Sequence, residues 1–193
     1  MKELRVGCAV CGSFCTIDRA IGAYEALAAQ GGYALTPIFS ETAYATDSRF
    51  GPAREFISRM EALCGRPVLH TVPEVEPIGP KALLDALIVA PCTGATLARL
   101  ARGMTDSSVA MAVKAHLRAG RPVILAVSTN DGLSGSAENI AALLNRKNVY
   151  FVPFGQDDPV KKPCSLAADL SRLEETLLAA LEGRQTQPVL VRG

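Results

Sequence analysis

The chain has 193 residues, of which 49% are hydrophobic, and its 20 Lys and Arg residues nearly balance its 19 Asp and Glu residues. This length and composition suit one α/β domain with a full hydrophobic core. The near-neutral charge argues against a nucleic-acid binder, which ordinarily shows a basic excess. No apolar run approaches the roughly 18 residues of a membrane span. The first residues, MKELR, show no signal-peptide pattern, so we expect a cytosolic protein without membrane or nucleic-acid partners.

Strand-like and helix-like segments alternate along the first half of the chain. Helical spacing of apolar residues, or a short β-branched run, marks each one. In order, we expect a strand over Leu4–Val10, a helix over Ile17–Gln30 that Gly31 and Gly32 end, a strand over Tyr33–Phe39, a helix over Pro52–Cys64 that Gly65 ends, a short strand over Val68–Thr71, and a strand over Leu83–Ala90 that Pro91 ends.

The same alternation continues in the second half. We expect helices over Gly94–Arg102 and Val109–Ala119, a strand over Pro122–Val127, a helix over Ser136–Leu144, a strand over Val149–Pro153 and a helix over Leu166–Glu182. This order predicts one doubly wound α/β domain over residues 1–183, with a parallel sheet, helices on both faces and right-handed crossovers. The tail, residues 184–193, has no helical pattern and is either disordered or an arm that packs on a neighbouring molecule.

Hydroxyl side chains follow four of the five main strands. Ligands bind beyond the carboxyl ends of the strands in such sheets. The residues in question are Gly12, Ser13 and Thr16 after the first strand, Ser40 and Thr42 after the second, Thr93, Gly94 and Thr96 after the third, and Ser128, Thr129 and Asn130 after the fourth. Hydroxyls and helix amino ends suit a phosphate. The alternative is that each Ser or Thr only caps a helix.

The kind of phosphate ligand is narrowed by two missing motifs. The first loop lacks G-x-G-x-x-G, which argues against a Rossmann dinucleotide site, and no lysine follows Gly12 as in a P-loop. A mononucleotide such as FMN fits the hydroxyl-rich edges better.

Six cysteines raise the question of a metal or redox site. Cys8 and Cys11 have the spacing of half a zinc site, but no second pair follows and the only histidines are His70 and His116. Buried free cysteine is the alternative interpretation, and we expect no metal site.

The loop motifs together resemble a known superfamily. Gly12-Ser13, Ser40 and the stretch APCTGATLARLARGMTDS are similar to FMN-dependent cysteine decarboxylases and flavin prenyltransferases, which share a Pro-x-Ser/Thr-x-x-Thr pattern. The resemblance implies FMN, and oligomers with the flavin at an interface. It assigns the FMN site to Gly12, Ser13, Ser40, Thr42, Pro91, Thr93, Gly94, Thr96, Asp106, Ser128, Thr129 and Asn130. The decarboxylases' histidine base and Asn-containing loop have no counterpart here, so decarboxylation is not expected and the catalytic residues stay unknown.

A narrower resemblance extends over nearly the whole chain. The strings SRFG, EPIGPK and FGQDDPVKKPCS look like the family of dipicolinate synthase B subunits from spore-forming bacteria. The resemblance implies a partner, the A subunit of the same synthase, that binds NADP. Together the two chains would oxidise dihydrodipicolinate to pyridine-2,6-dicarboxylate (dipicolinate) in the mother cell. Two other functions stay open: a non-catalytic activator of the A subunit, and an independent FMN-dependent decarboxylase.

Charged loop residues are candidates for binding the substrate's two carboxylates or the partner. The cations are Arg49, Lys81, Lys161 and Lys162, and Gln156, Asp157 and Asp158 share the last loop. Asp157 and Asp158 either cap a turn or pair with the two lysines. We hypothesise that this loop is a lid or a partner surface; the alternative is ordinary solvated charge.

Overall fold

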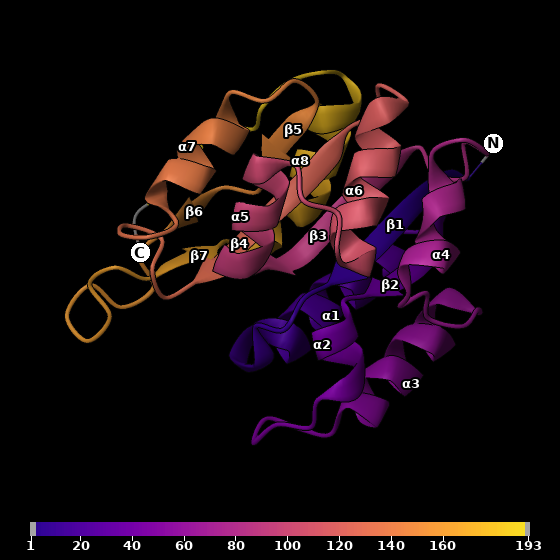
Figure 1. Cartoon of the computed structure of the whole chain (residues 1–193), viewed down its shortest axis with the longest axis horizontal. Coiled ribbons are helices and arrows are strands. Elements are labelled where there is room, and N and C mark those ends of the chain that lie inside the picture. Colours follow the sequence, from indigo (N-terminus) through magenta and orange to yellow (C-terminus); the bar gives the residue numbers. More distant parts are fainter. Residues whose placement is uncertain (1–2, 192–193) are drawn as a thin grey trace.

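A computed structural model describes residues 3–191 and places a β-sheet between two layers of helices (Figure 1). The parallel strands are β1 (Leu4–Val10), β2 (Tyr33–Phe39), β3 (Ala86–Cys92), β4 (Val123–Thr129) and β5 (Val149–Phe151). They are ordered β2-β1-β3-β4-β5. The order reverses between β1 and β3, and ligands of open α/β sheets bind at such a switch point.

Burial on both faces explains why these segments form the centre of the sheet. All seven residues of β3 are buried, and β4 is buried from Val123 to Ser128. Strands covered by helices on both sides need apolar residues at successive positions rather than at alternate ones. The continuous apolar runs therefore predict the central strands well, and β1 and β2 have the predicted bounds.

Helices cover both faces of the sheet, as the alternation of segments predicts. One face carries α1 (Phe14–Ala29), α3 (Ala53–Cys64) and α8 (Leu173–Leu181), and the other carries α5 (Gly94–Arg102), α6 (Ser108–Arg118) and α7 (Ala137–Leu144). The short elements α2 (Glu41–Ala45), α4 (Val72–Val75) and η1 (Glu76–Ile78) lie between β2 and β3 and were not predicted. The predicted strand over Val68–Thr71 is wrong except for one parallel bridge between Leu69 and Ile38.

Pro91 does not end β3, contrary to the sequence prediction. The strand starts later than predicted, at Ala86, and continues through Pro91 to Cys92. The pairing with β4 shifts between Val89 and Cys92, and such an irregularity is where a strand tolerates proline. The Pro91 carbonyl accepts a hydrogen bond from the Cys11 amide at 3.3 Å, which ties the ends of β3 and β1 together.

The predicted helix over Leu166–Glu182 is wrong in its first turn. Residues Leu166–Ala168 form β7, which pairs antiparallel with the end of β4 and with β6 (Phe154–Gly155). Asp169 then accepts a hydrogen bond from the Ser171 amide and begins η2 (Leu170–Arg172), ahead of α8. The antiparallel pairing of β7 makes the sheet mixed. Leucines at helical spacing therefore lie in a strand before Asp169 and in a helix after it.

The tail packs on the chain's own sheet, and neither alternative considered for it describes residues 184–191. The Gln185 amide pairs with both backbone groups of Phe151, at 2.8 and 2.7 Å, and Thr186 is buried. The Val189 carbonyl and the Val191 amide both bond to Phe154 at 3.0 Å. The tail thus forms one parallel bridge with β6, between Leu190 and Phe154, and contacts β5 through the Gln185 side chain. Residues 192–193 lie outside the described part of the chain.

We expect Gln185→Ala to lower the free energy of unfolding by about 2 kcal/mol. The substitution leaves the amide and the carbonyl of Phe151 without partners, and an unsatisfied buried polar group costs roughly 1–3 kcal/mol. Urea denaturation measures the change. Gln187→Ala is the matched control, because Gln187 is exposed on the same tail. Equal stabilities of the two variants would contradict this account of the tail.

Candidate functional site

Two cavities open at the carboxyl ends of the parallel strands and share Gly12 and Thr93. These residues directly follow β1 and β3, so the shared ridge lies at the switch point of the sheet. Their volumes of about 460 and 420 Å3 lie within the roughly 300–1,000 Å3 range of small-molecule sites.

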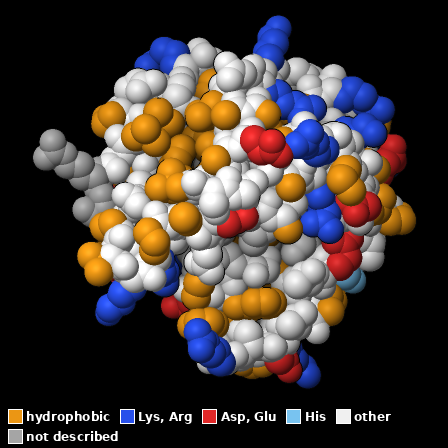
Figure 2. Space-filling view, turned by 60° about the vertical axis from the view of Figure 1, so that its left-hand side comes forward, with side chains coloured by type: hydrophobic (Ala, Val, Ile, Leu, Met, Phe, Trp, Pro, Cys, Tyr) orange, Lys and Arg blue, Asp and Glu red, His pale blue; other side chains and the backbone are white. Residues whose placement is uncertain are grey.

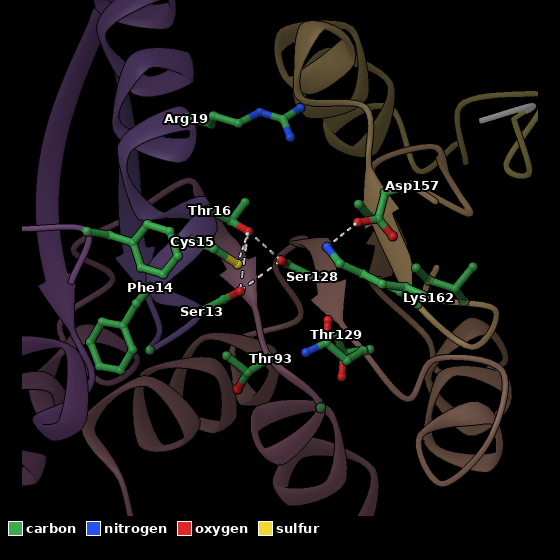
Figure 3. A pocket seen from close by; sticks show the side chains of 17 residues that line it. Ser13, Phe14, Cys15, Thr16, Arg19, Thr93, Ser128, Thr129, Asp157 and Lys162 are labelled. Carbon is green, nitrogen blue, oxygen red and sulfur yellow. Dashed lines mark hydrogen bonds and ion pairs between the residues drawn. The ribbon is translucent and has the colours of Figure 1, made fainter. Parts of the chain in front are cut away.

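The first cavity brings together most of the candidates from β1, β3, β4 and the late loop. Its lining includes Gly12, Ser13, Thr93, Gly94, Ser128, Thr129, Asn130, Asp157 and Lys162. Sequence reasoning did not assign Phe14, Cys15, Arg19, Phe50 or Ser165 to the site, and these also line it (Figure 3). Phe14 and Cys15 are missed because α1 begins at Phe14, three residues before its predicted start, and Arg19 is missed because the sequence does not say which side of this helix faces the cavity.

Three hydroxyls form a closed triangle at the floor of the first cavity. The Ser128 Oγ lies 2.9 Å from the Ser13 Oγ and 2.8 Å from the Thr16 Oγ1, and the last two atoms are 3.3 Å apart. Each hydroxyl has one proton and two lone pairs. Three mutual bonds therefore use all three protons, and an incoming acceptor must take a proton from one of these bonds. Ser13 makes no side-chain cap on α1, so the simple capping alternative does not describe it.

The second cavity contains the remaining hydroxyl candidates. It is lined by Ser40, Thr42, Thr93, Thr96, Asp106 and Ser107, among others. The capping alternative does hold here, because Ser40, Thr93 and Ser107 each accept a bond from the backbone amide three residues later. The Thr96 hydroxyl donates to the Cys11 Sγ at 3.3 Å. Burial raises the pKa of the Cys11 thiol to about 11, so this sulfur is not a thiolate nucleophile at neutral pH.

The charges around the second cavity are mostly engaged. A carboxylate oxygen of Glu41 accepts a bond from the Ser108 amide at 2.8 Å, which closes the amino end of α6. Arg99 pairs with Asp106 at 3.0 Å. Two carboxylates against one guanidinium leave this lining more negative than that of the first cavity, where Arg19 and Lys162 face one carboxylate, Asp157.

Gly94 begins α5 where the chain allows no side chain. A Cβ at this position would lie 2.6 Å from the Ser136 Oγ, 2.7 Å from the Thr129 Oγ1 and 2.9 Å from the Asp131 Oδ1. Asp131 accepts bonds from Thr129 and Ser136. The bond from Thr129 contributes most to lowering the pKa of this carboxyl, against the opposing effect of burial. Glycine therefore lets a fixed cluster of polar groups stand beside the cavity.

The loop between β6 and β7 contributes two charged residues to the first cavity. Lys162 Nζ lies 3.4 Å from a carboxylate oxygen of Asp157. Burial opposes ionisation of Asp157, but hydrogen bonds from Ser165 and Lys162 lower its pKa below the ordinary value. The Asp158 carboxylate accepts a bond from the Lys161 amide at 2.9 Å, so one acid pairs with a lysine and the other caps a turn. Gln156 donates to the Pro163 carbonyl at 2.8 Å across the loop.

Other candidates lie outside both cavities. Pro91 is buried behind them. Lys81 precedes β3 and so lies toward the amino end of the sheet, and the exposed Arg49 stacks 4.9 Å from the centre of the Phe50 ring. Gln156, Asp158 and Lys161 line neither cavity. The sequence places these residues in loops but does not say toward which end of the sheet, or to which side of it, a loop turns.

Neither histidine reaches the cavities. His70 stacks on Tyr44 with ring centres 3.6 Å apart, and His116 is buried in α6. Within residues 3–191, no group of three His, Cys, Asp or Glu side chains could hold a metal ion, and no helix is long and apolar enough to cross a membrane.

Comparison with known proteins identifies the family of the chain. The flavoprotein family profile matches residues 1–174. The dipicolinate synthase B subunit of Bacillus subtilis (strain 168) is 40% identical over 191 residues, which cover 99% of this chain and 95% of the relative. The chain belongs to the flavoprotein family. Its likeness to dipicolinate synthase B subunits extends over its full length.

Solved structures of flavoproteins agree with this assignment. The crystal structure of the dipicolinate synthase B subunit from Bacillus halodurans C has 41% identity and a TM-score of 0.89, and the match covers 100% of this chain and 99% of that one. A dodecameric FMN-dependent Ubix-like decarboxylase from Escherichia coli O157:H7 has 21% identity and a TM-score of 0.63, over 78% and 80% of the two chains. The second likeness shows the shared fold alone.

The residues present fit a flavin mononucleotide by one structural criterion. Gly12 borders both cavities and Gly94 borders the first, and a Cβ would come within 3.2 Å of Thr42 at Gly12 and within 2.6 Å of Ser136 at Gly94. Close approach of a flat ring to the backbone requires such glycines. Strand order 2-1-3-4-5 with FMN at the β1/β3 switch point is also the flavodoxin arrangement.

Proposed function

We propose that this flavoprotein is the B subunit of a dipicolinate synthase and holds FMN at the ridge between its two cavities. Two observations support this proposal. The first cavity, at the switch point, brings together Gly12, Ser13, Thr93, Gly94 and Ser128. The chain is also 40% identical to a dipicolinate synthase B subunit. The synthase's A subunit would be the partner and would bring NADP, because the first loop of this chain lacks the dinucleotide motif.

Each cavity would take one part of the cofactor. The hydroxyls of Ser40, Thr42 and Ser107 in the second cavity suit a phosphate at the amino end of α5. The ridge glycines and Phe14 would border the flavin ring on the side of the first cavity. When bound, FMN supplies the capacity to accept a hydride.

The reaction proposed for the two subunits removes one hydride and one proton from dihydrodipicolinate and leaves an aromatic pyridine ring. The protein's part is to orient the ring and exclude water, because the cofactors carry the redox chemistry. Neither histidine lines a cavity, so the proposal gives neither of them a role in the reaction. The dodecameric relative supports a homo-oligomer as a further expectation.

The loop between β6 and β7, with Gln156, Asp157, Asp158, Lys161 and Lys162, is the proposed lid or partner surface. Asp157 and Lys162 face the cavity, while Asp158 and Lys161 lie on the turn beside them. The inner pair therefore suits the substrate and the outer pair suits the A subunit. Lys81 lies too far toward the other end of the sheet to join either role.

Reconstitution tests the proposal. The A and B subunits are mixed with dihydrodipicolinate and NADP+, with and without FMN, and the ultraviolet absorbance of dipicolinate is followed. We expect product only when both chains are present. We also expect this chain to be yellow once it has been incubated with FMN and passed through gel filtration. A colourless chain that takes up no FMN yet stimulates the A subunit would be an activator instead. Carbon dioxide release from a peptidyl cysteine would indicate a decarboxylase.

A further inference from the structure

We propose that Arg19 and Lys162 form a two-cation clamp that binds the two carboxylates of a flat ring dianion in the first cavity. The clamp rests on the proposed function and names the substrate-recognising residues of that site. Arg19 comes from the second turn of α1, and Lys162 comes from the loop between β6 and β7 (Figure 3). The two cations therefore approach the cavity from different walls, one carboxylate to each.

Arg19 is available to a ligand. It is exposed at the mouth of the cavity, and none of the ion pairs within residues 3–191 involves it. Arg59 and Arg172, in contrast, are each held by carboxylates. A planar guanidinium with five N–H donors suits a carboxylate. On the face that Figure 2 shows, Lys and Arg side chains lie among Asp and Glu side chains.

Lys162 is held in place but keeps donors to spare. Asp157 binds its ammonium group at 3.4 Å, and this uses one of three N–H donors. Asp157 lines the same cavity, so this ion pair holds the lysine beside it. The lining of the first cavity then carries two cations against one carboxylate, whereas Glu41 and Asp106 outnumber Arg99 in the second. The two cations therefore give the first cavity a lining that suits a dicarboxylate.

The hydroxyl triangle leaves anion binding to these two cations. Ser13, Thr16 and Ser128 are hydrogen-bonded to one another, so a carboxylate that accepts a proton from one of them must break one of these bonds. Phe14 and Phe50 line the cavity as well and offer aromatic faces to a flat ring. The set fits a six-membered ring with two carboxylates rather than a phosphate.

Direct binding of the stable product tests the clamp. Pyridine-2,6-dicarboxylate and pyridine-2-carboxylate are titrated by calorimetry into the wild-type chain, Arg19→Gln and Lys162→Gln, each alone and in complex with the A subunit. Each substitution should lower the affinity for the dicarboxylate by about tenfold or more, because each removes a charge-assisted hydrogen bond. The monocarboxylate should bind more weakly and respond strongly to only one of the two substitutions. Added salt should weaken the wild-type interaction.

The controls are Arg54→Gln and Lys147→Gln, which remove exposed cations that line neither cavity and have no proposed role in binding the partner. Both should bind the dicarboxylate as wild type does. Unchanged binding in Arg19→Gln and Lys162→Gln, or no dicarboxylate binding to either wild-type form, would overturn the clamp. If the reconstituted complex forms product equally well with wild type, Arg19→Gln and Lys162→Gln, the clamp is refuted and the proposed function stands. Clamp-dependent binding without product formation refutes the proposed function and keeps the clamp.

Discussion

Replacing Gly94 with alanine should weaken FMN binding by about tenfold or more and lower the free energy of unfolding by roughly 1–3 kcal/mol. The new Cβ would lie 2.6–2.9 Å from atoms of Ser136, Thr129 and Asp131. Thr129 and Ser136 both donate hydrogen bonds to the Asp131 carboxylate, so none of the three side chains can move without breaking a hydrogen bond. The start of α5 must shift instead, and with it Thr93 at the ridge between the cavities.

Flavin fluorescence quenching and urea denaturation measure the two effects of Gly94→Ala. Gly22→Ala is the matched control, because Gly22 lies within α1 and a Cβ there would meet nothing within 4 Å. That control should keep FMN affinity and gain up to about 1 kcal/mol, since alanine is the better helix former. FMN affinity that is equal in the two variants would show that the cofactor does not use the start of α5.

Acidification should destabilise the protein between pH 7 and pH 5 by about 2 kcal/mol through His116 alone. His116 is 1% exposed, and its Nε2 has no hydrogen-bond partner within the described residues. Burial, together with the charge of Arg121, lowers the pKa of this imidazole to about 4. Above the unfolded value of about 6.5 both states are neutral. Below it, only the unfolded chain gains the proton, so stability falls until the folded pKa is reached.

Urea denaturation at pH 7, 6 and 5 measures this dependence. His116→Leu should remove most of the slope, whatever its stability at pH 7, because no titrating group remains in the buried position. The Asp85 carboxyl does not interfere, since its hydrogen bonds to Arg5 lower its pKa to about 2. An unchanged slope in His116→Leu would contradict the account, because it would mean that the imidazole has the same pKa in the folded and unfolded chains.

Local pattern was enough to predict most of the fold. Continuous apolar runs predicted the central strands, and helical spacing predicted six helices to within a few residues at most ends. The predictions were wrong where a distant segment decides the structure. Leu166 continues a helical pattern, but pairing with the end of β4 holds it in β7. Pro91 predicts the end of a strand, but the shifted register of the pairing with β4 accommodates the proline within β3.

Residues at strand ends were also predictable as a site, because parallel strands bring their carboxyl ends to one edge. This reasoning placed Gly12, Ser13, Thr93 and Ser128 together, and all four line the first cavity. It could not separate hydroxyls that bond to one another, as in the Ser13, Thr16 and Ser128 triangle, from hydroxyls that only cap helices, as at Ser40.

The sequence alone determined the doubly wound architecture, the hydroxyl-rich edge and the resemblance to dipicolinate synthase B subunits, because these depend on local spacing and on motifs. Only the tertiary structure decided which charges face the cavity. Arg19 and Lys162 are 143 positions apart in the chain (162 − 19), and on sequence grounds Lys161 was as good a candidate as its neighbour. The antiparallel pairing of β6 and β7 turns Lys162 inward across from α1 and leaves Lys161 on the outer turn. Contacts across such distances follow from packing, which no local pattern contains.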